Sequence, residues 1–162
     1  EKDSSFYTDW GDSREFTLGD LGIGECAGEV VSMTQFNLAN AELEVFEAQC
    51  YLLEGNYSQS DKMAYQSMLD AAIALVKQQW YDVPSEPDII LKEFKKRFFD
   101  TKLFFDRFAK SKFGKYLLQR HANGPVANTY EATHQLVEEA QLFIDAAHAC
   151  NARMRGLEIA AP

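Results

Sequence analysis

Apolar residues recur at steps of three and four along most of the chain after residue 33, the spacing of helices with one buried face. The pattern predicts a first helix that Asn40 caps and Gly55 ends. Its expected apolar face consists of Leu43, Phe46, Cys50 and Leu53. A second helix is predicted to begin at Ser60 or Asp61 and to run toward Trp80. Its expected apolar face consists of Ala64, Met68, Ala71, Ala72, Leu75 and Val76.

The loop 83–87 holds two of the four prolines and separates these helices from the next ones. A third helix is predicted from Asp88 to Ala109, a short helix from Lys115 to Arg120, and a last helix from Val126 to Met154. The third helix should bury Ile90, Leu91, Phe94, Phe98, Phe105 and Phe108. The last should bury Tyr130, Leu136, Val137, Ala140, Phe143, Ile144, Ala147 and Cys150. No segment after residue 33 shows the period of two typical of a strand, so the sequence predicts an all-α bundle of four main helices plus a short one.

Residues 1–32 differ in kind from the rest, because they hold five of the nine glycines and show no helical apolar period. Such a composition predicts turns and irregular backbone. The expected organisation is an acidic, glycine-rich leader (1–32), a helical bundle (33–156) and a C-terminal tail (157–162). We expect the leader to pack on the bundle, since its aromatic residues, among them Phe6, Trp10 and Phe16, would otherwise lie in water.

Composition narrows the class of protein. With 162 residues, 46% of them hydrophobic, the chain can bury one core, which excludes disorder for most of it. No apolar run approaches the ~20 residues that a bilayer requires, which argues against a membrane protein. Three cysteines without a CxxC pair exclude a disulfide framework or a four-cysteine zinc site and favour a reducing, cytoplasmic compartment. The chain begins at Glu1 rather than at Met, so we expect a trimmed protein or a piece of a longer one.

Charge is unevenly distributed along the chain. The net charge of −9 argues against general binding to nucleic acid or anionic lipid. Residues 1–30 carry eight acids and two bases, whereas residues 85–120 carry five acids and ten bases. The basic segment also holds seven phenylalanines, so it is either a solvated helix face, a contact for an acidic protein surface such as the leader, or an RNA site. Its candidate contact residues are Lys92, Lys95, Lys96 and Arg97.

Two short patterns carry candidate chemistry. Gly24-Glu25-Cys26-Ala27-Gly28 has the form G-x-C-x-G, which indicates either a nucleophile on a sharp strand-to-helix turn or a small cysteine packed in a glycine-rich turn. His134 shares a helix face with Glu131 and Glu138, which indicates either a weak metal site or a surface histidine with ion-pair partners. Three dispersed cysteines cannot hold a four-iron cluster, so we expect no metal and no cofactor in this chain.

Residues 61–151 resemble a HEPN domain, the helical module of prokaryotic toxin and nucleotide-associated proteins. The likeness rests on the Ala- and aromatic-rich run from Ala64 to Leu75 and on the run from Tyr130 to Ala147. It implies an up-and-down bundle, pairing as a homodimer, and a nucleotide- or RNA-linked role. Ribonuclease members carry an Arg, four to six polar residues and then a His. Here Arg120 directly precedes His121, so the resemblance does not imply RNA cleavage.

The segments 6–12 and 22–29, the latter containing GIGECAGE, are similar to the region that follows the catalytic part of some bacterial nitrite/sulfite reductases. This resemblance implies that sirohaem and a four-iron cluster belong to an upstream part, and that Trp10, Gly24, Cys26 and Gly28 contribute to contacts. The first hypothesis is therefore a non-catalytic accessory domain for dimerisation or for contact with the catalytic part of the same chain. The alternatives are a HEPN-type nucleotide or RNA binding module and a thiol enzyme using Cys26.

Overall fold

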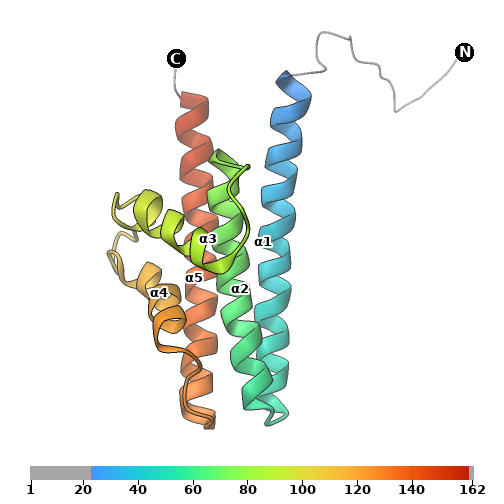
Figure 1. The fold of residues 1–162 in the computed structure, drawn as a ribbon, viewed down its shortest axis with the longest axis vertical. Coiled ribbons are helices and arrows are strands. Elements are labelled where there is room, and N and C mark those ends of the chain that lie inside the picture. The colour runs from blue at the N-terminus through green and yellow to red at the C-terminus, as the bar shows by residue number, and fades with distance from the viewer. Residues whose placement is uncertain (1–22, 161–162) are drawn as a thin grey trace, which may run out of the picture. The chain divides into compact units, whose positions relative to one another are not determined.

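The computed structural model describes the backbone of residues 23–160 and the side chains of residues 33–156. The described backbone forms α1 (Ile23–Leu53), α2 (Tyr57–Gln79), α3 (Pro87–Phe94), α4 (Lys112–Asn123) and α5 (Tyr130–Ala160) (Figure 1). A π-helical segment, η2 (Lys95–Phe99), continues α3. Residues 23–160 contain no strand, and one isolated bridge joins Asp106 to Lys110. The predicted all-α class is confirmed.

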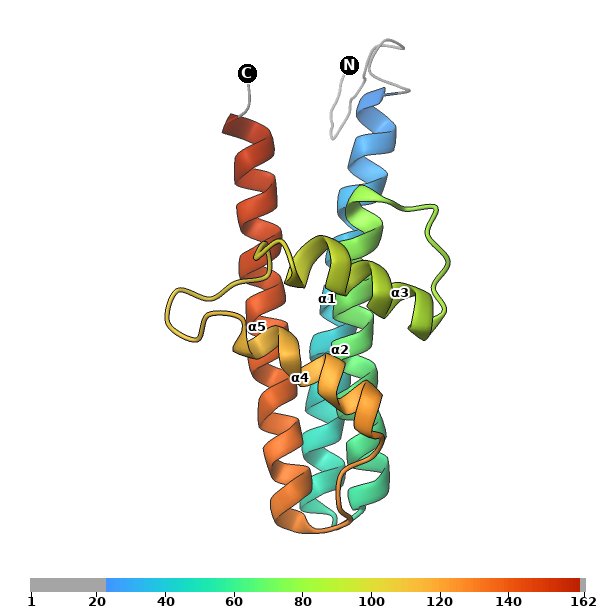
Figure 2. The ribbon, with the colours of Figure 1, turned by 60° about the vertical axis from the view of Figure 1, so that its left-hand side comes forward.

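Residues 33–162 form one compact unit. Within it, α2 and α5 run in the same direction, and the part of α1 from residue 33 runs beside them in the opposite direction (Figures 1 and 2). The shorter helices α3 and α4 lie across one side of the α2–α5 pair.

The turn between α1 and α2 has a clear local cause. Gly55 adopts a φ of +82°, which glycine tolerates best, and the Asn56 side chain accepts a hydrogen bond from the Gln59 amide at 3.3 Å.

The core combines an alanine-rich helix with a cluster of phenylalanines. The predicted apolar face of α2 is confirmed, since all six of its members are buried. Small side chains on α2 let α5 approach closely, and the space beside them is filled by aromatic rings. Four phenylalanines pack with ring centroids 4.8 to 5.7 Å apart: Phe94, Phe98, Phe104 and Phe143. The predicted core residues of the last helix are also buried, except Tyr130.

The start of the first helix corrects one prediction. The helix begins at Ile23, well before Asn40, so the backbone from Gly24 to Gly28 is helical and not an irregular leader or a tight turn. Each glycine inside a helix costs about 1 kcal/mol relative to alanine, a small cost once 31 residues propagate together. Neither the strand-to-helix turn of a Cys26 nucleophile nor the glycine-rich turn around a packed cysteine forms, because this backbone is helical. Residues 1–22, including Trp10, lie outside the described residues.

The predicted third helix is also shorter than expected. Its α-helical part ends at Phe94, η2 ends at Phe99, and the Phe104 amide then bonds back to the Phe98 carbonyl at 2.9 Å. This reversal places Phe104 in the core and leaves Phe108 85% exposed. The described part of the bundle thus has three long helices and two short ones, rather than four main helices and one short one.

Two further boundaries differ from prediction. The short helix α4 extends to Asn123, where Gly124 with a φ of +78° ends it, so part of the loop expected after Arg120 is helical. The last helix starts at Tyr130 and continues to Ala160, through most of the expected tail 157–162. Residues in that segment, such as Leu157 and Glu158, are good helix formers, so the helix continues through them.

Candidate functional site

The first helix carries two apolar stripes within residues 33–53. The inner stripe is buried and consists of Leu38, Ala41, Val45, Ala48 and Leu52. The outer stripe is between 54% and 81% exposed at its large residues, which are Met33, Phe36, Leu43, Phe46 and Leu53. The predicted face of this helix is therefore wrong, because Leu43, Phe46 and Leu53 point to solvent and Cys50 is only partly buried. The alanines of the inner stripe explain why this stripe is buried and the outer one is not. Their small size allows close packing, and the Ser60 hydroxyl of α2 donates to the Ala48 carbonyl at 2.6 Å.

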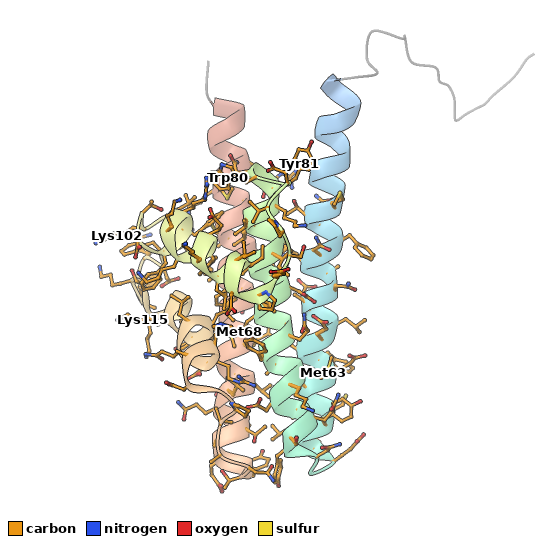
Figure 3. The ribbon with its side chains drawn as sticks, viewed as in Figure 1. Met63, Met68, Trp80, Tyr81, Lys102 and Lys115 are labelled. Atoms are coloured by element: carbon orange, nitrogen blue, oxygen red, sulfur yellow. The ribbon has the colours of Figure 1, made fainter. Side chains whose placement is uncertain are left out.

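The spacing of the outer stripe is that of a coiled-coil seam. Phe36, Leu43 and Cys50 are seven residues apart, and so are Ala39, Phe46 and Leu53, three positions later. These two series are the a and d positions of a heptad repeat, which in other proteins meet a second helix. Figure 3 shows side chains along α1 that project away from the other helices. Scattered exposed apolar residues are common, whereas a continuous apolar stripe is typical of an interaction surface.

The flanks of the outer stripe are acidic and amide-bearing. Glu47 and Asn40 lie on one side of it, and Glu42 and Gln49 lie on the other. Glu42 also contacts His148 of α5, and both side chains are about half exposed. No lysine or arginine occurs among residues 33–53.

A carboxyl pair connects α1 to α2 beside this surface. Burial raises the pKa of Glu44 to about 8, and its hydrogen bond with the Asp70 carboxyl and the charges of Asp70 and Glu47 add to the effect. The Asp70 carboxylate also accepts a hydrogen bond from the side-chain amide of Gln66 at 2.8 Å. Because the Glu44 carboxyl holds its proton at neutral pH, the two acidic groups can lie together without mutual repulsion.

A cluster of polar groups joins α2, α3 and α4, and it is buried at Asp61 and Arg120 but 91% exposed at Asp88. Asp61 and Arg120 form an ion pair at 2.5 Å with side-chain exposures of 5% and 8%. The second Asp61 oxygen accepts from the Val126 amide at 3.0 Å, and the Arg120 guanidinium lies 4.6 Å from the centroid of the Tyr65 ring. The Tyr65 hydroxyl contacts His121 Nδ1 at 2.8 Å. Burial raises the pKa of Tyr65.

This cluster continues to the N-terminus of α3, where His121 Nε2 lies 2.8 Å from an Asp88 carboxylate oxygen. Its groups contact one another across three helices, as in a structural network, although the buried Nε of Arg120 has no hydrogen-bond partner. The sequence pattern did not predict this cluster, and Arg120 and His121 entered only as a departure from a ribonuclease motif. The spacing of Asp61 and Tyr65 could have indicated it, because residues four apart share one face of a helix.

The predicted contact residues of the basic segment lie on α3 and η2. Lys95 pairs with Asp100 at 3.2 Å, and Arg97 pairs with Glu93 and lies 4.1 Å from the Trp80 ring centroid. Lys92 and Lys96 are exposed. The role of these four side chains as contact residues stays a prediction.

A second exposed feature is the turn 106–110. The Asp106 carboxylate accepts hydrogen bonds from the Phe108 and Ala109 amides at 2.8 and 2.7 Å, and these bonds lower the pKa of Asp106. The backbone of Asp106 also pairs with that of Lys110. The turn is thus held from within and presents Phe108 at its tip, with the Arg107 guanidinium 5.6 Å from the ring centroid.

The remaining candidate residues are not brought into a common site. His134 stacks on Tyr130 and lies 3.4 Å from Glu138, while Glu131 is exposed. Among the side chains that the structure describes, no group of three His, Cys, Asp or Glu residues is placed to hold a metal ion. Cys150 is buried against the Leu103 carbonyl, and desolvation raises the pKa of its thiol to about 11. The side chain of Cys26 lies outside the described residues.

Comparisons with known proteins give no relative. No protein-family model matches the chain, and neither a curated protein nor a solved structure matches it. The resemblances to HEPN domains and to nitrite/sulfite reductases therefore stay predictions. None of the helices within residues 23–160 is long and apolar enough to cross a membrane.

Proposed function

We propose that this chain is a non-catalytic helical accessory domain that binds another protein through the outer stripe of α1. The observation that supports this function is the exposure of Phe36, Leu43 and Phe46 on one continuous face with heptad spacing. Leaving large apolar side chains in water is unfavourable, and the bundle already has an inner stripe for its own core.

The sequence resemblance suggests the parent protein, a nitrite/sulfite reductase in which sirohaem and the iron–sulfur cluster belong to a separate catalytic part. The outer stripe would then bind that catalytic part or a second copy of this chain. The buried ion pair of Asp61 and Arg120 joins α2 to α4 and contributes to the scaffold that carries the stripe.

Binding measurements with a stripe variant test the proposal. Sedimentation measures self-association, and calorimetric titration measures binding to the catalytic part of a bacterial nitrite/sulfite reductase. We expect association in at least one of these experiments and a loss of at least tenfold in affinity for the Leu43→Gln/Phe46→Gln variant. Phe108→Gln is the matched control, because it removes an exposed aromatic ring far from α1 in sequence. If the wild-type chain binds neither probe, or if the stripe variant binds as well as wild type, the proposal is wrong.

The turn 106–110 favours a second candidate function, a HEPN-type module that binds single-stranded RNA without cleaving it. Its exposed Phe108 could stack on a base while Arg107 contacts a phosphate, which is a common mode of single-strand binding. Fluorescence anisotropy with a labelled RNA oligonucleotide tests this function. Tight binding that weakens steeply with salt and with Phe108→Ala would support it, and no binding at low salt would exclude it.

A further inference from the structure

We propose that the outer stripe of α1 pairs with the same stripe of a second copy, with the two helices antiparallel. This inference rests on the proposed function and specifies its partner. The stripe is self-complementary in both size and charge, and the register follows from the heptad positions described above.

Size complementarity is visible in the layers of the proposed pair. In the antiparallel register, Phe36 lies opposite Leu53 of the second copy, Leu43 opposite Phe46, and Ala39 opposite Cys50. Each large residue therefore meets one of similar size, and the two small residues meet each other. The three layers recur by symmetry in the other half of the seam, as a two-fold interface requires.

Charge selects both the direction and the register. In a parallel pair, Glu42 would face Glu47 of the second copy across the seam, which places like charges together. In the antiparallel register above, Glu47 faces Asn40 of the second copy and Glu42 faces Gln49, so each carboxylate meets an amide. Shifting the antiparallel pair by a heptad in either direction places Glu42 or Glu47 opposite itself and shortens the seam.

The exposed area is sufficient for a small dimer. Four large apolar side chains of the seam, Phe36, Leu43, Phe46 and Leu53, are more than half exposed and present an area on the order of 500 Å² per copy. A symmetric pair would bury about 1,000 Å² in total, the minimum expected of a specific interface. Covering this surface with a second copy would also remove the largest group of exposed apolar residues on the described part of the chain.

The chain's own N-terminal segment fits the outer stripe less well than a second copy does. Residues 1–22, which precede α1, have apolar residues of their own, but they carry six acids and two bases and would place acidic groups beside the acidic flanks of the stripe. The self-pair avoids that repulsion because its acids face amides.

Disulfide trapping tests the register. In a Cys26→Ser background, Ala39→Cys places a thiol opposite Cys50 of the second copy, and paired helices bring such Cβ atoms close to disulfide distance. We expect most of the Ala39→Cys protein to migrate as a covalent dimer on a non-reducing gel after incubation in a glutathione redox buffer. The Cys26→Ser parent, with Cys50 alone, should stay monomeric on the same gel, and so should Ala39→Cys combined with Cys50→Ser. Cys150 does not interfere, because it is fully buried.

The outcomes separate this inference from the proposed function. Cross-linking of the parent through Cys50 alone would show a parallel pair, and equal cross-linking without Cys50 would show random collision. Either result, or a monomer by sedimentation at all concentrations, overturns the antiparallel pair. If the monomeric chain still binds the reductase catalytic part through Leu43 and Phe46, the proposed function survives and only the self-pair fails. If no binding depends on the stripe, both fail.

Discussion

At the scale of single residues, Asp61 and Arg120 form a deeply buried ion pair between α2 and α4. Both charges are almost fully removed from water, and each is also engaged by a second group, the Val126 amide or the Tyr65 ring. Removing one member of such a pair leaves the other charge buried without compensation, and this costs more than the pair itself contributes.

We therefore expect Asp61→Ala to lower the free energy of unfolding by about 3–5 kcal/mol. Urea denaturation followed by circular dichroism measures the change. Glu138→Gln is the control, because it breaks an exposed contact with His134 and should cost less than about 1 kcal/mol. A loss for Asp61→Ala as small as that of the control would show that the pair does not hold the helices together.

Gly114 is the second residue whose identity the structure explains. A Cβ atom at this position would lie 2.7 Å from Cδ1 of Phe99, which is too close for any contact. Gly156 has no atom within 4 Å of the same position, although it also lies in a helix.

Gly114→Ala should consequently destabilise the protein by about 1–3 kcal/mol through overpacking. Gly156→Ala should be neutral or stabilising by up to about 1 kcal/mol, since alanine favours helix. Thermal unfolding of the two variants compares these effects directly. Equal midpoints for both variants would show that Phe99 moves away without cost.

At the scale of elements, the sequence predicted α2 and α5 well and α1 badly, for one physical reason. The second and last helices have a single apolar face, so their period alone identifies the buried side. The first helix has two, and the larger residues, Leu43 and Phe46, lie on the exposed one. Periodicity cannot tell a core face from an interaction face. Only the close packing at Ala41 and Ala48 decides which stripe turns inward.

Alanine substitutions on the two faces of α1 should therefore differ strongly. Leu38→Ala removes a buried side chain and should cost about 2–5 kcal/mol, whereas Leu43→Ala should cost less than about 0.5 kcal/mol in the monomer. Urea denaturation at a concentration where the chain is monomeric measures both. A larger cost for Leu43→Ala than for Leu38→Ala would mean that the faces are reversed.

The contact between α1 and α2 should make stability depend on pH. Glu44 ionises near pH 4.5 in the unfolded chain and near pH 8 in the folded one. Between these values the folded state binds more protons, so the free energy of unfolding should fall as pH rises from about 4.5 to about 8. In Glu44→Gln this decrease should be much smaller. The midpoint of urea denaturation, measured at several pH values in that range, reports this change in stability. Glu54→Gln is the control, because Glu54 is exposed. Identical slopes in Glu44→Gln and wild type would contradict the raised pKa.

At the scale of the whole molecule, fold class was predictable and the candidate site was not. Helical periodicity extends over most of the chain, so the all-α class follows from local pattern alone. The shortening of the third helix does not, because Phe104 replaces Phe105 and Phe108 only through a backbone reversal that the core geometry selects. The network from Asp61 to Asp88 was missed because its members lie far apart in sequence.

The claim that the outer stripe of α1 is a protein-binding surface is tested most directly by hydroxyl-radical footprinting. Oxidation of Phe46 and Leu43 should fall at least severalfold when the chain is concentrated or mixed with the reductase catalytic part. Oxidation of Phe108, which is exposed and outside the stripe, should stay constant in the same samples. Unchanged oxidation of Phe46 and Leu43 under both conditions would contradict the claim.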